Sequence, residues 1–247
     1  MTELEFYNKQ FEKYGRYDRG SRESKNYDMS NPEDYFESLV YRMSSKDKTL
    51  VDLGCGDGLF TATLAPLNRR VVGVEPSNLI NVANSKANNS TDRNLSFVRE
   101  NAENLSFTDS TVDIAISRRG PNPAKEVSRI LKAGGMFAFI TIGEKDCIEL
   151  KEFVGRGQHF GDSSKVKEEL ANLFQTHGFE IMECSDFLYQ EQYESEESLI
   201  EFLHQVPIFD GFNSKDYSEV SKYCASFWGN GIQLNRHRVV LLAKLSS

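Results

Sequence analysis

The sequence predicts an α/β protein in which a doubly wound, mostly parallel sheet carries helices on both faces. An apolar run at 49–53 leads directly into a turn with glycine at every second position, at 54–58. Apolar runs that suit buried strands then alternate in order with segments of helical spacing as far as residue 142. A length of 247 residues with 39% hydrophobic content is sufficient for one sizeable core. Alternation of this kind is typical of a parallel sheet covered by helices on both sides.

The N-terminal part is expected to hold a helix that leads into the sheet. Asn31 followed by Pro32 is typical of a helix start, with the asparagine as cap and the proline in the first turn. The segment 14–22 interleaves arginines with tyrosines, which suits either a cover over an anionic or aromatic substrate or a solvated arm. Both interpretations stay open. Tyr17 is the residue of this segment that we expect to contact a substrate.

The glycine turn follows the first core strand, Thr49–Leu53, and precedes a helix expected at 58–66. Glycine at such a join permits backbone angles closed to other residues and lets a ligand approach the main chain. A dinucleotide fingerprint would read Gly-x-Gly-x-x-Gly, but here the third glycine, Gly58, comes one residue early. Asp52, two residues before the first glycine, would repel a pyrophosphate and attract a cationic amine. These features predict a nucleotide-type pocket at the carboxyl end of the first strand.

Strands and helices are expected to continue in alternation beyond this turn. The later strands are predicted at Arg70–Glu75, Leu95–Arg99, Thr111–Ser117, Gly135–Thr141, Phe179–Tyr193 and, last, Arg238–Lys244. The later helices are predicted at 123–132, 143–154 and 163–177. Gly134 and Gly178 are expected to stop the first and the last of these helices, and Ser163 is expected to cap the last.

The order Asp52-x-Gly54-x-Gly56-x-Gly58 resembles motif I of the class I S-adenosylmethionine-dependent methyltransferases, and the strands that follow agree with that family in their order. The resemblance covers residues 31–142 closely and the final strands less closely. It implies a Rossmann-like, doubly wound, mostly parallel seven-stranded sheet with an antiparallel last strand and helices on both faces. S-adenosylmethionine is then the expected cofactor, with S-adenosylhomocysteine as its product and no metal.

The resemblance also implies which residues bind the cofactor. Glu75, at the end of the second strand, stands where this fold sets a carboxylate against the ribose hydroxyls. The stretch 101–107 resembles the adenine-edge loop, in which Asn101 replaces the usual acid and can still accept a hydrogen bond from the adenine amino group. Cys55 is expected to be a small residue of the turn. The full set expected to bind the cofactor is Asp52, Gly54, Cys55, Gly56, Gly58, Glu75, Pro76, Asn101, Ala102, Glu103 and Ser117.

The segment after the fourth strand, 117–123, is expected to meet the substrate, because in this fold that strand ends beside the transferable methyl group. It lacks the Asn/Asp-Pro-Pro-aromatic tetrad with which amine-methylating relatives hold a planar amine. Arg118 and Arg119 instead suit a carboxylate or phosphate of the acceptor. Adjacent strand residues face opposite ways, so one arginine is expected to line the pocket, unless it pairs with an acid of a neighbouring loop. His159 is a candidate proton acceptor, against a surface hydrogen-bonding role, and Tyr17 is a second weak catalytic candidate.

One domain is expected to occupy residues 1–247. Its expected parts are an N-terminal helical cap at 1–45, a Rossmann-like core at 46–193 and 236–247, and a helical lid insertion at 194–235. The insertion carries Phe209, Phe212 and Trp228, whose rings either cover the substrate or form the insertion's own small core. The second interpretation is favoured for each ring.

Composition limits the partners. A net charge of −8 and a pI near 5.2 disfavour a large nucleic acid, which requires a concentrated positive surface. The four cysteines form no Cys-x-x-Cys pair, so neither a zinc site nor a disulfide scaffold is indicated. With neither an apolar run of membrane-span length nor a signal-like start, a cytoplasmic location without membrane insertion is expected.

The function expected from the resemblance is methyl transfer to a small, anionic acceptor by in-line displacement, in which the acceptor attacks the sulfonium methyl group. The chain is similar to small-molecule methyltransferases of the ubiquinone and menaquinone biosynthetic type. A methyltransferase acting on rRNA or tRNA and a non-catalytic protein that binds S-adenosylmethionine stay open as alternatives. The sequence does not predict the acceptor atom or the oligomeric state.

Overall fold

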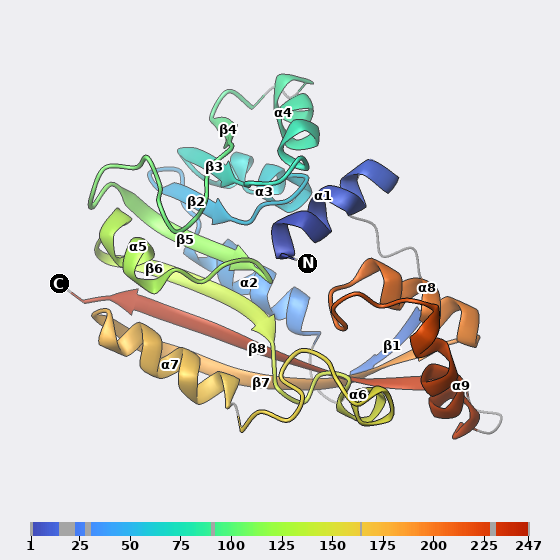
Figure 1. Ribbon diagram of the computed structural model, residues 1–247. Helices are drawn as coiled ribbons and strands as arrows, with labels where there is room; N and C mark the ends of the chain where they lie inside the picture. The colour runs from blue at the N-terminus through green and yellow to red at the C-terminus, as the bar shows by residue number, and fades with distance from the viewer. Residues whose placement is uncertain are drawn as a thin grey trace.

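The computed structural model describes residues 2–14, 23–27, 31–89, 92–163, 165–227 and 231–246. Within them, eight strands form one sheet in the order β1-β7-β8-β6-β5-β2-β3-β4 (Figure 1). The strands are β1 (Glu23–Tyr27), β2 (Thr49–Leu53), β3 (Arg70–Val74), β4 (Leu95–Val98), β5 (Val112–Arg118), β6 (Leu131–Ile142), β7 (Phe179–Tyr193) and β8 (Ile232–Leu245). The helices are α1 (Glu3–Tyr14), α2 (Pro32–Met43), α3 (Leu59–Thr63), α4 (Ile80–Asn89), α5 (Ala124–Ile130), α6 (Ile148–Val154), α7 (Val166–Thr176), α8 (Glu196–Gln205) and α9 (Tyr217–Ala225).

Strand direction confirms the predicted mostly parallel sheet and its antiparallel last strand. β2 pairs in parallel with β3 and β5, and β4 and β6 extend this parallel block on either side. β8 runs antiparallel between β6 and β7. The carboxyl ends of the parallel strands and the beginning of β8 therefore share one edge of the sheet.

The expected number of seven strands is wrong by one, because β1 adds an eighth. Glu23–Tyr27 pairs antiparallel with the end of β7, from Glu23 opposite Tyr193 to Tyr27 opposite Tyr189. The segment was expected to belong to a purely helical cap. Its residues, Glu-Ser-Lys-Asn-Tyr, lack the apolar alternation that signals a half-buried strand. A polar strand of this kind is tolerated at a sheet edge, where one side faces solvent.

Helices cover both faces of the sheet, as predicted. Leu50 packs in the cluster formed with α2 and α4, where Phe36 and Ile80 are buried. Val51, the next residue of the same strand, packs on the other face with α5 and α7, where Phe174 is fully buried. Successive strand residues thus supply opposite layers, and the strands that carry the functional side chains are held from both sides.

A third apolar cluster joins α6, α8 and α9 to the end of β7 and the beginning of β8. Phe209 is buried in it and Phe212 packs against it, which agrees with the small-core interpretation for these two rings. Trp228 lies outside the described residues. β8 begins at Ile232, so the last residues of the expected insertion are part of the sheet.

Several element boundaries differ from prediction. α2 has the predicted cap, since the Asn31 side chain accepts a hydrogen bond from the Glu33 amide at 3.0 Å. α5 ends at Ile130 and passes straight into β6, so Gly134, with φ of 75°, lies in an irregular strand start and does not stop the helix. α7 begins at Val166, and Ser163 is not its cap. None of the helices in the described ranges is long and apolar enough to span a bilayer.

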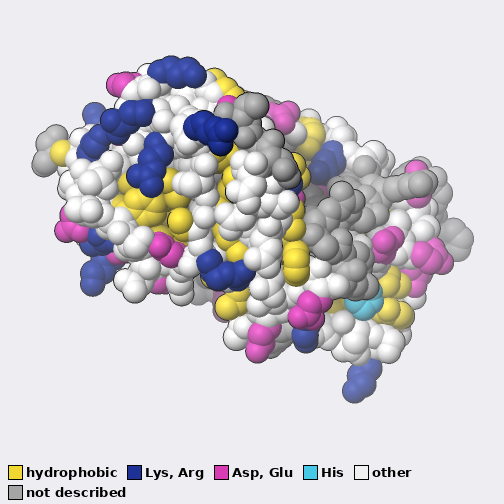
Figure 2. All heavy atoms as spheres, turned by 90° about the horizontal axis from the view of Figure 1, so that it is seen from above, with side chains coloured by type: hydrophobic (Ala, Val, Ile, Leu, Met, Phe, Trp, Pro, Cys, Tyr) yellow, Lys and Arg dark blue, Asp and Glu magenta, His cyan; other side chains and the backbone are white. Residues whose placement is uncertain are grey.

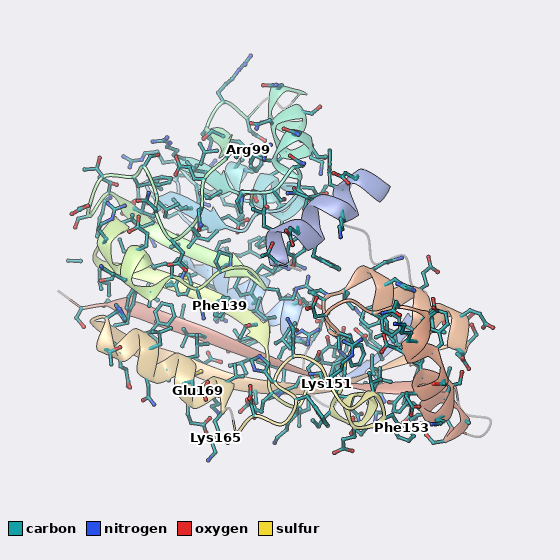
Figure 3. The ribbon with its side chains drawn as sticks, viewed as in Figure 1. Arg99, Phe139, Lys151, Phe153, Lys165 and Glu169 are labelled. Atoms are coloured by element: carbon teal, nitrogen blue, oxygen red, sulfur yellow. The ribbon has the colours of Figure 1, made fainter. Side chains whose placement is uncertain are left out.

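Phe137 provides a test of the core. Its ring is fully buried and stacks on Phe174 with centroids 4.9 Å apart. Phe137→Ala should lower the free energy of unfolding by about 3 to 5 kcal/mol, because the site cannot collapse around the cavity. The side chain of Phe153, in α6, is 41% exposed at the edge of the third apolar cluster (Figure 3). Phe153→Ala should therefore lower the free energy of unfolding by about 1 kcal/mol or less. Urea unfolding measures both, and equal losses would contradict the assignment.

Candidate functional site

A cavity of about 800 Å³ opens at the carboxyl edge of the parallel strands. Along the sheet its lining comes from the ends of β3, β2, β5 and β6 and from the beginning of β8. The loop after α6, the segment 206–208 and helix α1 close it from outside the sheet. The volume is within the range of pockets that hold small ligands.

The glycine turn adopts the left-handed backbone that its sequence requires. Gly54, Gly56 and Gly58 have φ of 74°, 56° and 73°. A Cβ on Gly54 would lie 2.9 Å from Pro121 Cδ, so this glycine lets the turn pack against the segment after β5. A Cβ on Gly58 would lie 2.5 Å from the Phe97 ring. Gly58 does not line the cavity, and its role in the structure is to let α3 lie close to the sheet.

Asp52, at the end of β2, is a buried carboxylate, and one of its two oxygens has no hydrogen-bond partner among the described residues. Oδ2 accepts a hydrogen bond from the Thr61 hydroxyl at 2.6 Å. Oδ1 is buried and has no partner among the described residues. Burial raises the pKa of Asp52 to about 6. A cationic ligand group in the cavity would stabilise the ionised form and satisfy the free oxygen.

Glu75 follows β3 and is held by two backbone donors. The Gly56 amide donates to Oε2 at 3.0 Å, and the Ser77 amide donates to Oε1 at 2.9 Å. The side chain lines the cavity beside the glycine turn. An ionised carboxylate has about four acceptor positions, so each oxygen keeps capacity for a ligand hydroxyl.

The other residues predicted for the cofactor divide into two groups. Cys55, Pro76, Asn101 and Ala102 line the cavity, as do Gly54 and Gly56. Burial raises the pKa of the Cys55 thiol, which keeps it a neutral turn residue. The Asn101 side-chain oxygen accepts a hydrogen bond from the Glu103 amide at 3.0 Å, so part of its expected capacity is used within the loop.

Glu103 and Ser117 do not line the cavity, although both belong to the predicted set. Glu103 is exposed. Ser117 is fully buried, and its Oγ has no hydrogen-bond partner in the described part of the chain. A Cβ on Gly120 would lie 3.0 Å from that oxygen, so Ser117 sits beneath the turn after β5. Ligand contact by these two side chains therefore has no geometric support.

Both predicted arginines line the cavity, whereas one alone was expected. Arg118 is the last residue of β5, and Arg119 has φ of 59°, which ends the strand and breaks the alternation of side chains. Arg118 pairs with Glu33 at 2.7 Å and with Glu37 at 3.0 Å, and its guanidinium lies 5.1 Å from the Phe60 ring centre. Arg119 Nε lies 3.6 Å from Glu33. The alternative expectation, pairing with neighbouring acids, also applies, but the acids belong to helix α2.

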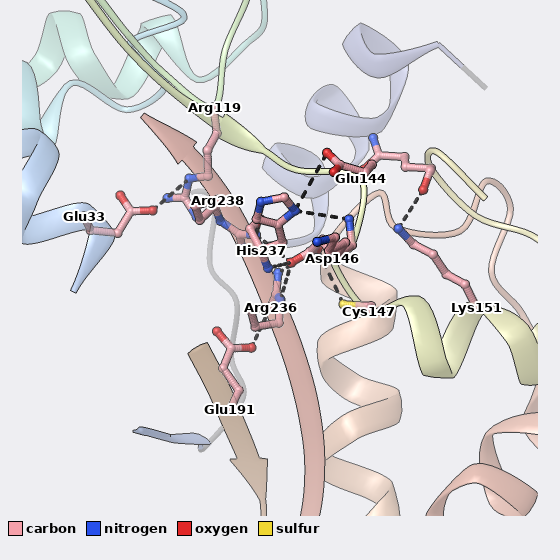
Figure 4. A network of polar contacts seen from close by, with 12 residues as sticks. Glu33, Arg119, Glu144, Asp146, Cys147, Lys151, Glu191, Arg236, His237 and Arg238 are labelled. Carbon is pink, nitrogen blue, oxygen red and sulfur yellow. Dashed lines mark hydrogen bonds and ion pairs between the residues drawn. The ribbon is translucent and has the colours of Figure 1, made fainter. Parts of the chain in front are cut away.

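Two further arginines, Arg236 and Arg238 on β8, line the cavity and were not predicted (Figure 4). Both are almost fully buried and both bond Asp146, from Arg236 Nε at 2.8 Å and from Arg238 Nη1 at 2.6 Å. Arg236 also pairs with Glu191. Burial would raise the pKa of Asp146, but the two arginines outweigh it and hold the pKa well below its usual range. The signal in the sequence was the spacing of Arg236 and Arg238 by two, just before an apolar strand.

The charge that the cavity presents reverses along the edge of the sheet. β3 and β2 end in the carboxylates of Glu75 and Asp52, whereas β5 and β8 present arginines. The four acids that pair with these arginines, Glu33, Glu37, Asp146 and Glu191, do not line the cavity. Three inter-strand spacings separate β2 from β8, which is about 14 Å.

The two weak catalytic candidates have different outcomes. His159 lines the cavity from the loop after α6, with φ of 60°, and its ring has no hydrogen-bond partner in the described ranges. Tyr17 lies outside the described residues. Instead, Leu4 and Tyr7 of α1 line the cavity, which the sequence did not indicate. No group of three or more His, Cys, Asp or Glu side chains suited to a metal ion occurs among the described residues.

A second hollow, of about 770 Å³, lies at the opposite, amino end of the parallel strands. Its lining includes Arg69, Arg70, Arg93 and Lys132. Figure 2 shows Lys and Arg side chains gathered toward one end of the face that carries β4 and α4. Lys132 pairs with Asp113 at 2.6 Å, and Arg69 donates to the Thr49 hydroxyl at 3.0 Å. These contacts give Lys132 and Arg69 structural roles.

Comparisons with known proteins identify the central part of the chain. Residues 51–139 match the family model described as methyltransferase domain. The biotin biosynthesis bifunctional protein BioHC of Cellvibrio japonicus is 33% identical over 122 residues, which cover 46% of this chain and 24% of that protein. The probable S-adenosylmethionine-dependent methyltransferase CRG1 of Saccharomyces cerevisiae is 28% identical over 134 residues, which cover 51% of this chain and 46% of that protein. The chain thus spans less than half the length of these two curated relatives.

A solved structure shares the fold over most of the chain. It is a putative methyltransferase from Bacillus halodurans, with a TM-score of 0.66 and 17% identity, and the match covers 87% of this chain and all of that one. At this identity the likeness shows the fold. Residues 51–139 thus match a methyltransferase domain, and the chain has the Rossmann-like fold of the solved structure.

Asp52 gives a testable pH dependence. Because burial raises its pKa from 3.8 to about 6, the folded chain binds more protons than the unfolded chain between these pH values. The free energy of unfolding therefore falls as the pH rises through this window. Asp52→Asn keeps an acceptor for Thr61 and carries no charge, so its stability relative to the original chain should rise by about 2 kcal/mol between about pH 4 and pH 7.

Urea unfolding at the two pH values, without ligand, measures this difference. Asp162→Asn, at an exposed position of the loop before α7, is the matched control and should show no such rise. An Asp52→Asn difference that stays constant with pH would contradict the assigned direction of the pKa shift.

Proposed function

We propose that this chain, whose residues 51–139 match a methyltransferase domain, is a class I S-adenosylmethionine-dependent methyltransferase that transfers a methyl group to a small, anionic acceptor. The observation that supports this most directly is the buried, unpartnered oxygen of Asp52 beside Glu75 and the glycine turn, at one end of a cavity whose other end carries arginines. The first end suits a ligand with an ammonium group and hydroxyls. The second suits an anion.

The residues present fit S-adenosylmethionine. Asp52 Oδ1 would accept a hydrogen bond from the ammonium group, and Gly54 and Gly56, which line the cavity without side chains, leave room for the ligand at the turn. Glu75 would accept hydrogen bonds from the ribose hydroxyls. Asn101 and Ala102 would lie along the adenine. Gly58, Glu103 and Ser117 have no place in this assignment, because they do not line the cavity.

The chemistry of the transfer requires little from the protein besides alignment. S-adenosylmethionine, when bound, supplies a methyl group that the sulfonium charge already activates. The walls of the cavity would hold an acceptor beside the bound cofactor and would exclude water from it. His159, which lines the cavity without a hydrogen-bond partner in the described ranges, is positioned to take a proton from an acceptor that must lose one.

The acceptor side of the cavity favours a small molecule. Val206, Pro207 and Ile208 add an apolar wall to the cavity that the arginines line. A volume of about 800 Å³ accommodates a cofactor and a compact acceptor together. These features support a small-molecule acceptor over RNA, and the arginines support transfer over simple cofactor storage. A ubiquinone-like substrate class stays a prediction from the sequence.

The activity is tested by incubating the protein with methyl-labelled S-adenosylmethionine and separate fractions of small metabolites and RNA. Label should pass to the small-molecule fraction, and mass spectrometry of that product identifies the acceptor. Calorimetry with S-adenosylhomocysteine tests cofactor binding independently. Transfer confined to RNA would select the RNA alternative. Binding of a nicotinamide dinucleotide, with none of S-adenosylhomocysteine, would overturn the proposal.

Glu75→Ala should weaken S-adenosylhomocysteine binding by about 1.5 to 3 kcal/mol, the range for hydrogen bonds to a charged group. Calorimetry measures the change, and circular dichroism verifies that the variant is folded. Glu103→Ala is the matched control, because this acid directly follows the lining residues Asn101 and Ala102 in the sequence but does not itself line the cavity. Unchanged affinity in folded Glu75→Ala would remove Glu75 from the site.

A further inference from the structure

We infer that Arg238 and Arg119 together form a binding site for an oxyanion, a carboxylate or a phosphate, carried by the methyl acceptor. This inference rests on the proposed function, and it assigns the recognition of the acceptor to a strand that the sequence did not indicate. The two residues belong to β8 and to the turn after β5, on either side of β6.

Arg238 is buried with guanidinium donors unused. Its Nη1 donates to Asp146 at 2.6 Å and to the His237 carbonyl at 2.8 Å. Its Nε is buried and has no hydrogen-bond partner among the described residues. The Tyr189 ring, 5.7 Å from the guanidinium carbon, covers one side. An almost fully buried arginine costs stability unless its donors are satisfied, and the cavity that it lines is where a partner can enter.

Arg119 is held beside the same cavity by its backbone, while its guanidinium is free to bond a ligand. The Arg119 amide donates to the Ile140 carbonyl at 2.8 Å, which fixes the residue at the end of β5. The next two residues, Gly120 and Pro121, pack against the glycine turn. Its side chain reaches Glu33 at 3.6 Å, which is an ion pair but is too long for a hydrogen bond. Its donors therefore have no hydrogen-bond acceptor in the described part of the chain.

Glu33 supplies one carboxylate to three arginines, Arg118, Arg119 and Arg238. Figure 4 shows its ion pair with Arg119. It hydrogen-bonds Arg118 at 2.7 Å, whereas Arg119 and Arg238 act on it through charge. Burial would raise the pKa of Glu33, but these three guanidiniums outweigh it and lower the pKa to about 2. Glu33 does not line the cavity. A second carboxylate entering from the cavity would give Arg119 and Arg238 the hydrogen-bond acceptor that Glu33 does not provide.

The other residues that line the cavity indicate what the rest of the acceptor is like. Val206, Pro207 and Ile208 give the cavity an apolar wall, which suits a hydrocarbon body attached to the anion. Asp52 and Glu75, at the far end, would repel the same anion. The acceptor class is thus a small amphiphilic acid whose charged end lies at β5 and β8.

The test uses the full chain saturated with S-adenosylhomocysteine and three probes with eight carbon atoms each: octanoate, octyl phosphate and octanamide. Calorimetry at constant ionic strength should show saturable binding of at least one anionic probe and weaker binding of neutral octanamide. Preference between octanoate and octyl phosphate distinguishes a carboxylate from a phosphate acceptor. Equal binding of octanamide, or no saturable binding of either anion, would overturn the inference.

Variants identify the residues. Arg119→Gln should weaken binding of the anionic probe by about tenfold or more, because a hydrogen bond to a charged group is worth at least this factor. Arg238→Lys keeps the positive charge beside Asp146 but loses the planar guanidinium. It should therefore also weaken binding of the anionic probe while preserving the fold. Glu33→Gln removes the carboxylate that competes for the arginines, so it should strengthen binding of the anionic probe. Arg70→Gln, at the amino end of the sheet, is the matched control and should change nothing.

Failure of this inference can be told apart from failure of the proposed function. If the chain binds S-adenosylhomocysteine but Arg119→Gln and Arg238→Lys bind the anionic probe as well as the original chain does, the oxyanion site is wrong and the proposed function stands. If S-adenosylhomocysteine does not bind, the proposed function fails at its first step. Should Arg238→Lys fail to fold, Arg119→Gln and Glu33→Gln, with effects of opposite sign, still decide.

Discussion

The parallel pairing of β2 with β3 and β5, continued to β6, is the constraint on which the site depends. Parallel strands bring their carboxyl ends to one edge, and each of these strands contributes a residue at or next to its end to the lining of the cavity. The antiparallel β8 extends the same edge with its beginning, because it runs between β6 and β7 in the opposite direction. Its register sets Arg238 opposite Ile142, the last residue of β6. Arg119 and Arg238, which are about 120 positions apart in the sequence, thereby line one cavity.

Holding arginines at this edge requires buried counter-charges. Removing one partner of a buried ion pair typically costs about 3 to 5 kcal/mol, because the remaining charge is left uncompensated. Asp146 bonds both Arg236 and Arg238, and it also accepts a hydrogen bond from the His237 amide at 3.0 Å. One carboxylate therefore fixes the backbone of β8 and the two side chains on its cavity face. The acids lie behind the arginines, so the cavity itself meets guanidinium groups.

The sequence was informative wherever a local pattern determines the backbone. β2 and β7 have the predicted bounds, and α2 has the predicted cap, because apolar alternation, strand length and capping residues act over a few positions. β1 could not be predicted, since its polar residues are ordered through pairing with β7, far along the chain. Arg236 and Arg238 were missed for a similar reason. Nothing near them in the sequence indicates that Asp146 will cover their charge, and an isolated pair of charges at a strand start is usually solvated.

The reversal of charge along the cavity also limits how two reactants can lie in it. A cationic sulfonium compound is attracted to the end formed by Asp52 and Glu75, and it is repelled by the arginines of β5 and β8. An anionic acceptor has the opposite preference, so the exchanged arrangement places like charges together at both ends. Penalties against the wrong arrangement contribute to specificity as much as contacts in the right one. Within a distance of about 14 Å between β2 and β8, the two ligands must meet near β5 and β6. In the proposed reaction, alignment for transfer would thus follow from the order of the strands and the sign of the charge at each strand end.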